Sequence, residues 1–358
     1  MNLLLFIVGL AALVAGASLL VRGASALALS FGVSPLVVGL TIVAFGTSSP
    51  EVAVSVGAAL EGQTDIAVGN VVGSNIFNVL FILGASALIV PLVVHVQLIR
   101  QEVPIMIGAS LLLIALGFDG RLTRLDAALL FGLLVVYTVF LIVQSRRQTQ
   151  EAVAELTAEL PRSAAWDRHW AVQVALVVAG LVLLVLGSDW LVTAAVTFAK
   201  ALGVSDLVIG LTIVAAGTSL PEVAASVTAA IRGQRDIAVG NVIGSNTFNI
   251  LGVLGLSGLI APLPLAVPQS LLEFDMLVML AVAFACLPVF FTGATIARWE
   301  GAVFLGYYVA YVTFLVLTAQ QHEARATFAL AMQTVVLPLT VLTLLVVSVR
   351  AWRARHAA

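Results

Sequence analysis

Charged residues are scarce in this chain of 358 residues. Only 9% of the residues are charged and 61% are hydrophobic, whereas soluble domains carry about 25% charged residues. This composition excludes an ordinary soluble domain and indicates an integral membrane protein. The formal net charge of −2 gives no reason to expect a nucleic acid as partner.

Cysteine and histidine are also rare. The single cysteine, Cys286, lies in an apolar run, so the chain has no disulfide framework and no thiolate metal site. The four histidines lie near the ends of apolar runs or between them, which argues against a serine hydrolase within the membrane. An aspartyl protease would need two buried aspartates, and the acids that we expect to be buried are glutamates. We therefore expect neither an enzyme nor a resident cofactor.

The chain contains many long apolar runs. They lack the alternation of transmembrane strands and are long enough for helices, so the predicted fold class is an all-α integral membrane protein. We expect eleven spans, at about 3–21, 33–60, 66–90, 97–118, 124–144, 170–190, 204–231, 237–261, 270–292, 300–319 and 326–349.

Two segments of the chain repeat each other. Residues 32–92 and 203–263 align without a gap and share 44 of 61 residues. They belong to two units of five spans, residues 1–145 and 170–320, joined by a polar linker at 146–169 that has room for a short surface helix. Because five is odd, the second unit enters the membrane in the opposite direction, which predicts two inverted-topology five-helix repeats with ten core helices. Residues 321–358 add an eleventh transmembrane helix and a basic tail.

The basic residues predict the orientation, because they are enriched in cytoplasmic loops. With the amino terminus outside, twelve arginines face the cytoplasm, and the basic residues that remain outside are Arg121, Arg124, Lys200 and Arg325. We therefore expect a multi-pass protein of the cell (cytoplasmic or inner) membrane, with the amino terminus outside and both the linker and the carboxyl terminus in the cytoplasm.

A short motif places a carboxylate in the second span of each unit. Gly-Thr-Ser-Ser-Pro-Glu ends at Glu51, and Gly-Thr-Ser-Leu-Pro-Glu ends at Glu222, 171 positions later. A charge within a membrane span costs from about 2.5 kcal/mol upward, so such residues are mostly functional. Glycine and proline should interrupt the helix there and free carbonyls such as those of Ala44 and Thr47 to face a cavity.

The third span of each unit supplies further oxygen atoms. Asn70, Ser74 and Asn78 recur at four-residue spacing and therefore share one helix face; their counterparts in the second unit are Asn241, Ser245 and Asn249. Sites made only of oxygen suit hard cations such as Na⁺, Ca²⁺ and Mg²⁺. Two ionised carboxylates balance one Ca²⁺ or two Na⁺, and competition for shared carboxylates is a physical basis for exchange.

Structural roles compete with these functional interpretations. Glycine, serine and threonine often serve helix packing in membranes, and an asparagine can support interrupted backbone instead of touching an ion. Both readings stay open for Asn70, Asn75, Asn241 and Asn246. For the two glutamates the alternative is a structural ion pair, but no lysine or arginine lies in the core of any span, so an external cation is expected.

The doubled motif, each copy followed by Gly-Asn-Val-(Val/Ile)-Gly-Ser-Asn, resembles the α-repeats of the cation/Ca²⁺ exchanger superfamily, and most of all its prokaryotic sodium/calcium exchangers. The resemblance covers about the first 320 residues and implies a ten-helix fold, so the eleventh span has no equivalent in it. It implies four central cation sites made by these ligand residues: Glu51, Glu222, Thr47, Thr218, Ser48, Ser219, Ser74, Ser245, Asn78, Asn249, Ala44 and Ala215. The carbonyls of the threonines and alanines are the implied ligand atoms. Amides at positions 78 and 249 resemble K⁺-independent exchangers.

The predicted function is secondary active antiport of Na⁺ against Ca²⁺ by alternating access, electrogenic and independent of K⁺. The alternatives are a Ca²⁺/H⁺ antiporter of the same fold, in which protons neutralise the two glutamates, and a cation channel. Dense hydroxyl groups favour Na⁺, because protons need no coordination shell. The expected partners are Ca²⁺, Na⁺ and the lipid bilayer, and nothing in the sequence implies a protein partner.

Overall fold

The computed structural model describes residues 2–159, 169–202 and 215–357. This part of the chain is almost entirely helical, and its only strands are four two-residue segments. Nine of its helices are long and apolar enough to cross a membrane, or ten if one bent pair is a single span. The prediction of an all-α membrane fold is confirmed, although the predicted span 204–231 lies partly outside the described residues.

The first unit begins with the long helix α1. Its elements are α1 (Asn2–Phe31), α2 (Pro35–Val38), η1 (Gly39–Val43), α3 (Ala44–Thr47), α4 (Ser49–Leu60), α5 (Thr64–Phe77), η2 (Asn78–Leu83), α6 (Gly84–Ile89), β1 (Leu92–Val93), η3 (Leu98–Glu102), α7 (Val103–Leu116), η4 (Gly117–Asp119), β2 (Arg121–Leu122) and α8 (Arg124–Glu159).

The second unit repeats this order from α9 onward. Its described elements are α9 (Trp170–Ala201), α11 (Ala215–Gly217), α12 (Leu220–Ile231), α13 (Arg235–Phe248), η7 (Asn249–Leu254), α14 (Gly255–Ile260), β3 (Leu265–Ala266), η8 (Leu271–Asp275), α15 (Met276–Phe291), β4 (Thr295–Ile296) and α16 (Arg298–Ala319). The chain continues through α17 (Ala324–Ala331), η9 (Met332–Val336) and α18 (Leu337–Ala357).

Three helices are longer than their apolar runs predicted. Helix α1 continues about ten residues past the expected end at 21, and α9 continues to Ala201 instead of 190. Helix α8 runs to Glu159 and so enters the segment expected to be a linker. Hydropathy marks the part of a helix that lies in lipid, whereas backbone hydrogen bonds continue the helix into water until a breaking residue ends it.

The two long helices α1 and α9 pack antiparallel through glycines. A Cβ atom on Gly180 would lie 2.6 Å from the backbone nitrogen of Leu20 and 2.8 Å from the carbonyl oxygen of Gly16. A Cβ atom on Gly187 would lie 2.8 Å from the carbonyl oxygen of Gly9. Because glycine has no Cβ atom, the two backbones come into direct contact. Close packing of this kind holds membrane helices together, since no hydrophobic driving force acts between them in lipid.

The two units also exchange contacts outside the repeated segments. Strand β1 pairs with β4, and β2 pairs with β3, so each small sheet joins one unit to the other.

Within each unit an acid on the fourth span contacts a tyrosine on the fifth. The hydroxyl of Tyr137 on α8 donates to Oε2 of Glu102 at 2.7 Å. Tyr311 on α16 donates to Oδ1 of Asp275 at the same distance. The same acid–tyrosine contact thus ties the fourth span to the fifth in both halves, a regularity that the sequence comparison missed.

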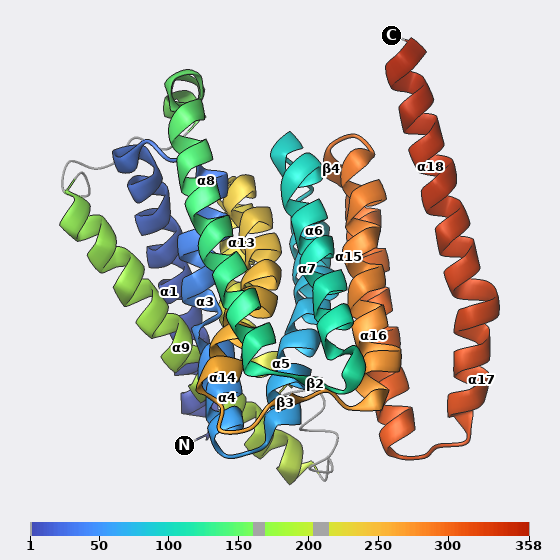
Figure 1. Cartoon of the computed structure of the whole chain (residues 1–358). Helices are drawn as coiled ribbons and strands as arrows, with labels where there is room; N and C mark the ends of the chain where they lie inside the picture. Colours follow the sequence, from blue (N-terminus) through green and yellow to red (C-terminus); the bar gives the residue numbers. More distant parts are fainter. Residues whose placement is uncertain (1, 160–168, 203–214, 358) are drawn as a thin grey trace.

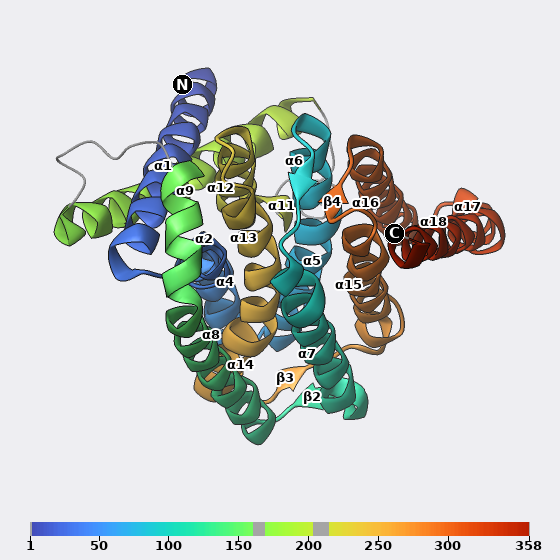
Figure 2. The same cartoon turned by 90° about the horizontal axis from the view of Figure 1, so that it is seen from above.

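Helices α5 and α13 lie at the centre of the bundle in both views (Figures 1 and 2). The apolar window of α13 is 94% buried, whereas that of the span formed by α17, η9 and α18 is 0% buried. That last span stands beside α15 and α16 at one edge of the molecule (Figure 1). The beginning of α1 and the end of α18 lie at opposite ends of the bundle.

Candidate cation site

The motif of each unit forms a break between two helical segments. Helix α3 ends at Thr47, α4 begins at Ser49, and the axes before and after the break differ by 45°. Ser48 between them has φ −79° and ψ 9°, and Ser219 has the matching values of −90° and 7°. Pro50 and Pro221 stand at the start of the second helix, where a missing N–H costs no helical hydrogen bond.

The break leaves particular carbonyl groups without their helical donors. Pro50 cannot donate to the carbonyl of Gly46, which instead accepts the hydroxyl of Ser49 at 2.8 Å. The carbonyl of Thr47 lies at the break itself, directly before Ser48. The Ala44 carbonyl was also expected to be freed, but it keeps its helical bond from the amide of Ser48 at 3.0 Å.

The second unit solves the same problem with a different side chain. The residue equivalent to Ser49 is Leu220, whose side chain has no hydrogen-bond donor. The carbonyl of Gly217 accepts instead the hydroxyl of Ser188 on α9 at 2.6 Å. Ala215 is the first residue of α11, directly after residues that lie outside the description.

Each carboxylate accepts a hydrogen bond from a serine hydroxyl of the other unit. Oε1 of Glu51 accepts from Ser219 at 2.7 Å, and Oε1 of Glu222 accepts from Ser48 at 2.9 Å. Ser74 of the first unit is a weaker partner of Glu51, at 3.5 Å. Both glutamates have 0% exposure, and each is hydrogen-bonded to the serine of the other motif. The two motifs therefore meet at one place, as the inverted repeat predicted.

Four asparagines cross-link the third spans. The Nδ2 atom of Asn75 donates to the backbone carbonyl of Asn246 at 3.1 Å, and Asn246 returns the same bond to Asn75 at 3.3 Å. Asn78 donates to Oδ1 of Asn246 at 2.9 Å, and Asn249 donates to Oδ1 of Asn75 at 3.1 Å. Asn75 and Asn246 are thus used in protein contacts that orient Asn78 and Asn249.

Two further asparagines brace the helices that carry the glutamates. Asn70 donates to the hydroxyl of Ser55 at 2.9 Å and Asn241 to that of Ser226 at 2.9 Å. Oδ1 of Asn241 also accepts the hydroxyl of Thr47 at 3.1 Å. Of the two interpretations left open for these residues, the geometry favours support of the interrupted segments. Ser55 and Ser226 were not predicted, although they occupy equivalent positions of the two repeats.

Six oxygen atoms of the predicted ligand set have no hydrogen-bond partner within the described chain. They are Oε2 of Glu51 and Glu222, Oδ1 of Asn78 and Asn249, and the hydroxyls of Ser245 and Thr218. Buried polar atoms are nearly always paired, so an unpaired set needs an explanation. The hydrogen bonds above join the two motifs at the glutamates and, in a separate network, the four asparagines of the third spans. Ser74, which contacts Glu51, is next to Asn75 on α5, and we call these residues together the buried cluster.

Among the described residues, no lysine or arginine is hydrogen-bonded or ion-paired to either glutamate. An ion pair between Arg121 and Asp119 at 3.6 Å lies at the surface. Within the described ranges no three acids, histidines or cysteines gather into a metal-binding group. The two carboxylates therefore act with neutral oxygens, and this donor set suits a hard cation.

The third spans have a feature that the sequence did not predict. Both change from α-helix to π-helix at the site asparagine, with η2 beginning at Asn78 and η7 at Asn249. Single π turns widen a helix and occur frequently at functional sites. The two π-helices begin at equivalent positions of the repeats, so the repeat relates one to the other. No residue pattern in the apolar run, however, predicts that a π-helix begins there.

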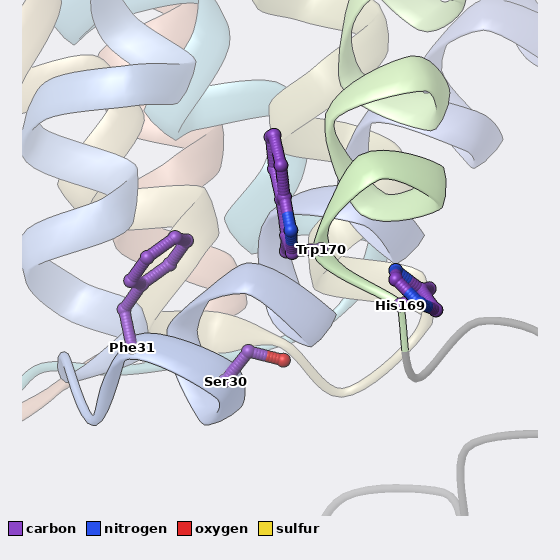
Figure 3. Close-up of a pocket in the computed structure, with 4 residues that line it drawn as sticks. All are labelled: Ser30, Phe31, His169 and Trp170. Atoms are coloured by element: carbon purple, nitrogen blue, oxygen red, sulfur yellow. The ribbon is translucent and has the colours of Figure 1, made fainter.

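A cavity elsewhere in the molecule shares no residue with this cluster. It measures about 690 Å³ and is lined by Ser30 and Phe31 at the end of α1 and by His169 and Trp170 at the start of α9 (Figure 3). The described residues of its lining include no carboxylate.

Comparisons with known proteins agree with this geometry. A family model described as "Sodium/calcium exchanger protein" matches residues 1–143 and 172–317. The chain is 37% identical over 292 residues to the inner membrane protein YrbG of Escherichia coli, covering 79% of this chain and 87% of that protein. It is 36% identical over 345 residues to the sodium/calcium exchanger MaX1 of Methanosarcina acetivorans, covering 88% and 98%. A solved structure of the sodium-calcium exchanger NCX_Mj aligns with a TM-score of 0.73 and 30% identity, over 87% of this chain and 98% of that one.

Proposed function

Since this chain belongs to the sodium/calcium exchanger protein family and is a multi-pass membrane transporter, not an enzyme, we propose that it exchanges Na⁺ for Ca²⁺ across the cell membrane. The single observation that carries the proposal is the pair of buried carboxylates. Within the described chain each keeps one oxygen without a hydrogen-bond partner, and no lysine or arginine pairs with either of them. A transported cation supplies the missing charge and the missing contacts.

The proposed ligands are the residues that the two motifs and the third spans contribute. Glu51 and Glu222 hold Ca²⁺ together with the carbonyls of Thr47 and Thr218. Na⁺ ions share the same carboxylates and use the remaining ligands, which are Ser48, Ser219, Ser74, Ser245, Asn78, Asn249 and the carbonyls of Ala44 and Ala215. Because both ions need the two glutamates, the binding of one displaces the other.

Complete burial of both carboxylates favours alternating access over a channel. With 0% exposure of either side chain, an ion bound there has no contact with water on either side. A continuous pore requires ions to enter and leave without closing the protein around them. Inverted repeats around a buried site instead suit a transporter that opens to one side at a time.

The proposed stoichiometry is three Na⁺ for one Ca²⁺. Two ionised glutamates and neutral amides at positions 78 and 249 leave the site neutral with Ca²⁺ bound. With three Na⁺ the same site carries one positive charge, on which the membrane potential acts with about 2.3 kcal/mol per 100 mV. Transport is therefore electrogenic, and because both amides are neutral we propose no K⁺ coupling.

Calcium uptake into proteoliposomes tests this function. An outward Na⁺ gradient should drive uptake, a potential that is negative inside should slow uptake coupled to Na⁺ exit, and K⁺ should have no effect. Uptake driven by a pH gradient alone and unaffected by Na⁺ would instead support a Ca²⁺/H⁺ antiporter. Uptake that ignores the potential would contradict the proposed stoichiometry.

We place the amino terminus outside and the carboxyl terminus in the cytoplasm, from the distribution of the arginines. Labelling tests this orientation. A Glu155→Cys variant in a Cys286→Ala background should resist an impermeant thiol reagent in intact cells and react after the membrane is opened. Efficient labelling of intact cells would reverse the orientation.

A further inference from the structure

The last span carries an amide that nothing in the described chain satisfies. Gln333 lies in η9, and its side chain is exposed. It makes no hydrogen bond to any residue that the structure describes. Between Phe328 and Val347 the other residues of this span are apolar or are threonines satisfied within the helix. The threonines Thr334, Thr340 and Thr343 donate to carbonyls four residues earlier.

The depth of Gln333 places this amide in the hydrocarbon layer. It lies nine residues inside the span, or about 14 Å at 1.5 Å per residue. The hydrocarbon core is about 30 Å thick, so the side chain lies close to its middle. Lipid tails offer no hydrogen bonds there, and an amide that lacks a partner is unfavourable.

The bundle does not cover this side of the helix. The hydroxyl of Tyr307 on α16 contacts Thr340 and the carbonyl of Val336, and Leu344 packs against the core. Apart from these contacts the span is exposed, with 0% of its apolar window buried. Residues three and four positions from Gln333, Leu330 and Leu337, are 61% and 44% exposed. Together with Val341, at 56% exposure, they form with Gln333 what we call the outer face.

We propose that the outer face docks on the outer face of a second copy of this chain, with the two Gln333 amides paired. All copies insert in the same orientation, so a two-fold axis along the membrane normal brings Gln333 of each copy to the same depth. An amide carries both donors and an acceptor, so two copies of one residue satisfy each other. The chain contains such a pair: Gln101 and Gln144 exchange hydrogen bonds of 2.9 and 2.8 Å.

This interface is independent of the cation cluster. The span lies at the edge of the bundle beside α15 and α16, away from the central helices α5 and α13 (Figure 2). It also gives a role to the eleventh span, which the ten-helix architecture does not require. Interhelical amide contacts are among the main sources of affinity between membrane helices.

Counting subunits in liposomes tests the proposal. The full-length protein, labelled with one fluorophore, is reconstituted at decreasing protein-to-lipid ratios, and bleaching steps per vesicle report the dimer fraction. We expect Gln333→Leu to raise the dissociation constant by roughly tenfold. The matched control is Thr343→Val, which removes an exposed hydroxyl already bonded to the carbonyl of Leu339 at 2.8 Å, and should leave it unchanged.

Crosslinking locates the interface. In a Cys286→Ala background that keeps Gln333, Leu337→Cys should form intermolecular disulfides on oxidation. Val139→Cys, on exposed α8 at the other side of the bundle (Figure 2), should not. A protein that stays monomeric at high protein-to-lipid ratio, as expected if Gln333 meets lipid or the helix of another protein, would overturn the proposal. Dimers that are insensitive to Gln333→Leu and crosslink elsewhere would also overturn it.

Discussion

The hydroxyl of Ser219 donates to Oε1 of Glu51 at 2.7 Å although the two residues are 168 positions apart in the chain. The mirror contact runs from Ser48 to Glu222 at 2.9 Å. The hydroxyl donor of each carboxylate therefore comes from the motif of the opposite unit and not from its own motif. Any change in how the two units pack alters both glutamates together, which suits a site that has to open alternately to two sides.

Removing either carboxylate charge should abolish exchange. We expect Glu51→Gln and Glu222→Gln each to weaken Ca²⁺ binding by at least about 100-fold, because breaking a buried charge set costs about 3–5 kcal/mol. The control Glu61→Gln removes an exposed carboxylate just after α4 and should leave transport near the original rate. Calcium flux into proteoliposomes measures the effect, after insertion of each variant has been verified. Normal flux in either site variant would remove the central claim.

The cross-unit hydrogen bonds predict a specific pattern of coupling. Ser48→Ala should lose about 1.5–3 kcal/mol if the bond to the ionised Glu222 is intact. The double variant with Glu222→Gln should lose less than the sum of the two changes, by about 0.5–3 kcal/mol. With Glu51→Gln the two losses should be closer to additive. Thermal unfolding in cation-free buffer supplies these values, and stronger coupling of Ser48 to Glu51 would contradict the observed pairing.

Asn249→Asp should shift ion preference without stopping transport. The Nδ2 atom of Asn249 donates to Oδ1 of Asn75 at 3.1 Å. In Asn249→Asp a carboxylate oxygen replaces this donor, so the hydrogen bond to Oδ1 of Asn75 is lost. The carboxylate also adds a third negative charge to the site. The site should then favour a higher total cation charge, for example an additional monovalent ion. Competition between Na⁺ and Ca²⁺ in flux assays, with and without K⁺, reports the change. An unaltered competition curve would show that position 249 lies outside the ion path.

Gly180→Ala should separate α1 from α9. The added Cβ atom would lie 2.6 Å from the backbone nitrogen of Leu20, so one helix has to move, at a cost of about 1–3 kcal/mol. Gly132→Ala on α8 is the matched control, because nothing lies within 4 Å of its added Cβ atom and alanine favours a helix by up to about 1 kcal/mol. Thermal unfolding in detergent compares the two, and equal stability would argue against close contact of the long helices.

Tyr137→Phe should destabilise the pairing of the fourth and fifth spans. The change leaves Oε2 of the buried Glu102 without its 2.7 Å partner, which costs about 1–3 kcal/mol. Tyr308→Phe serves as control, because its ring packs against Phe77 and Phe81 while its hydroxyl has no hydrogen bond in the described ranges. If both variants melt at the same temperature, the acid–tyrosine contact contributes nothing to stability.

The amino-acid sequence by itself determined the membrane class, the helical fold and the inverted repeat. These depend on quantities that are local or additive along the chain: the hydropathy of a run, an odd number of spans, and 44 shared residues in 61. It also singled out the two glutamates, because a carboxylate in an apolar run is costly wherever the fold places it; the full set of ligands stays a prediction.

Only the tertiary structure decided which partner each polar atom takes. Ser48 donates to Glu222 and not to Glu51. Asn75 and Asn246 form hydrogen bonds between the units. The Ala44 carbonyl keeps its helical donor. Helix length also escaped prediction, since α8 continues beyond its apolar run. The exposure of Gln333 belongs with these features. Hydrogen-bond partners and helix faces depend on how distant segments pack, and a linear pattern of residues does not contain the distances between them.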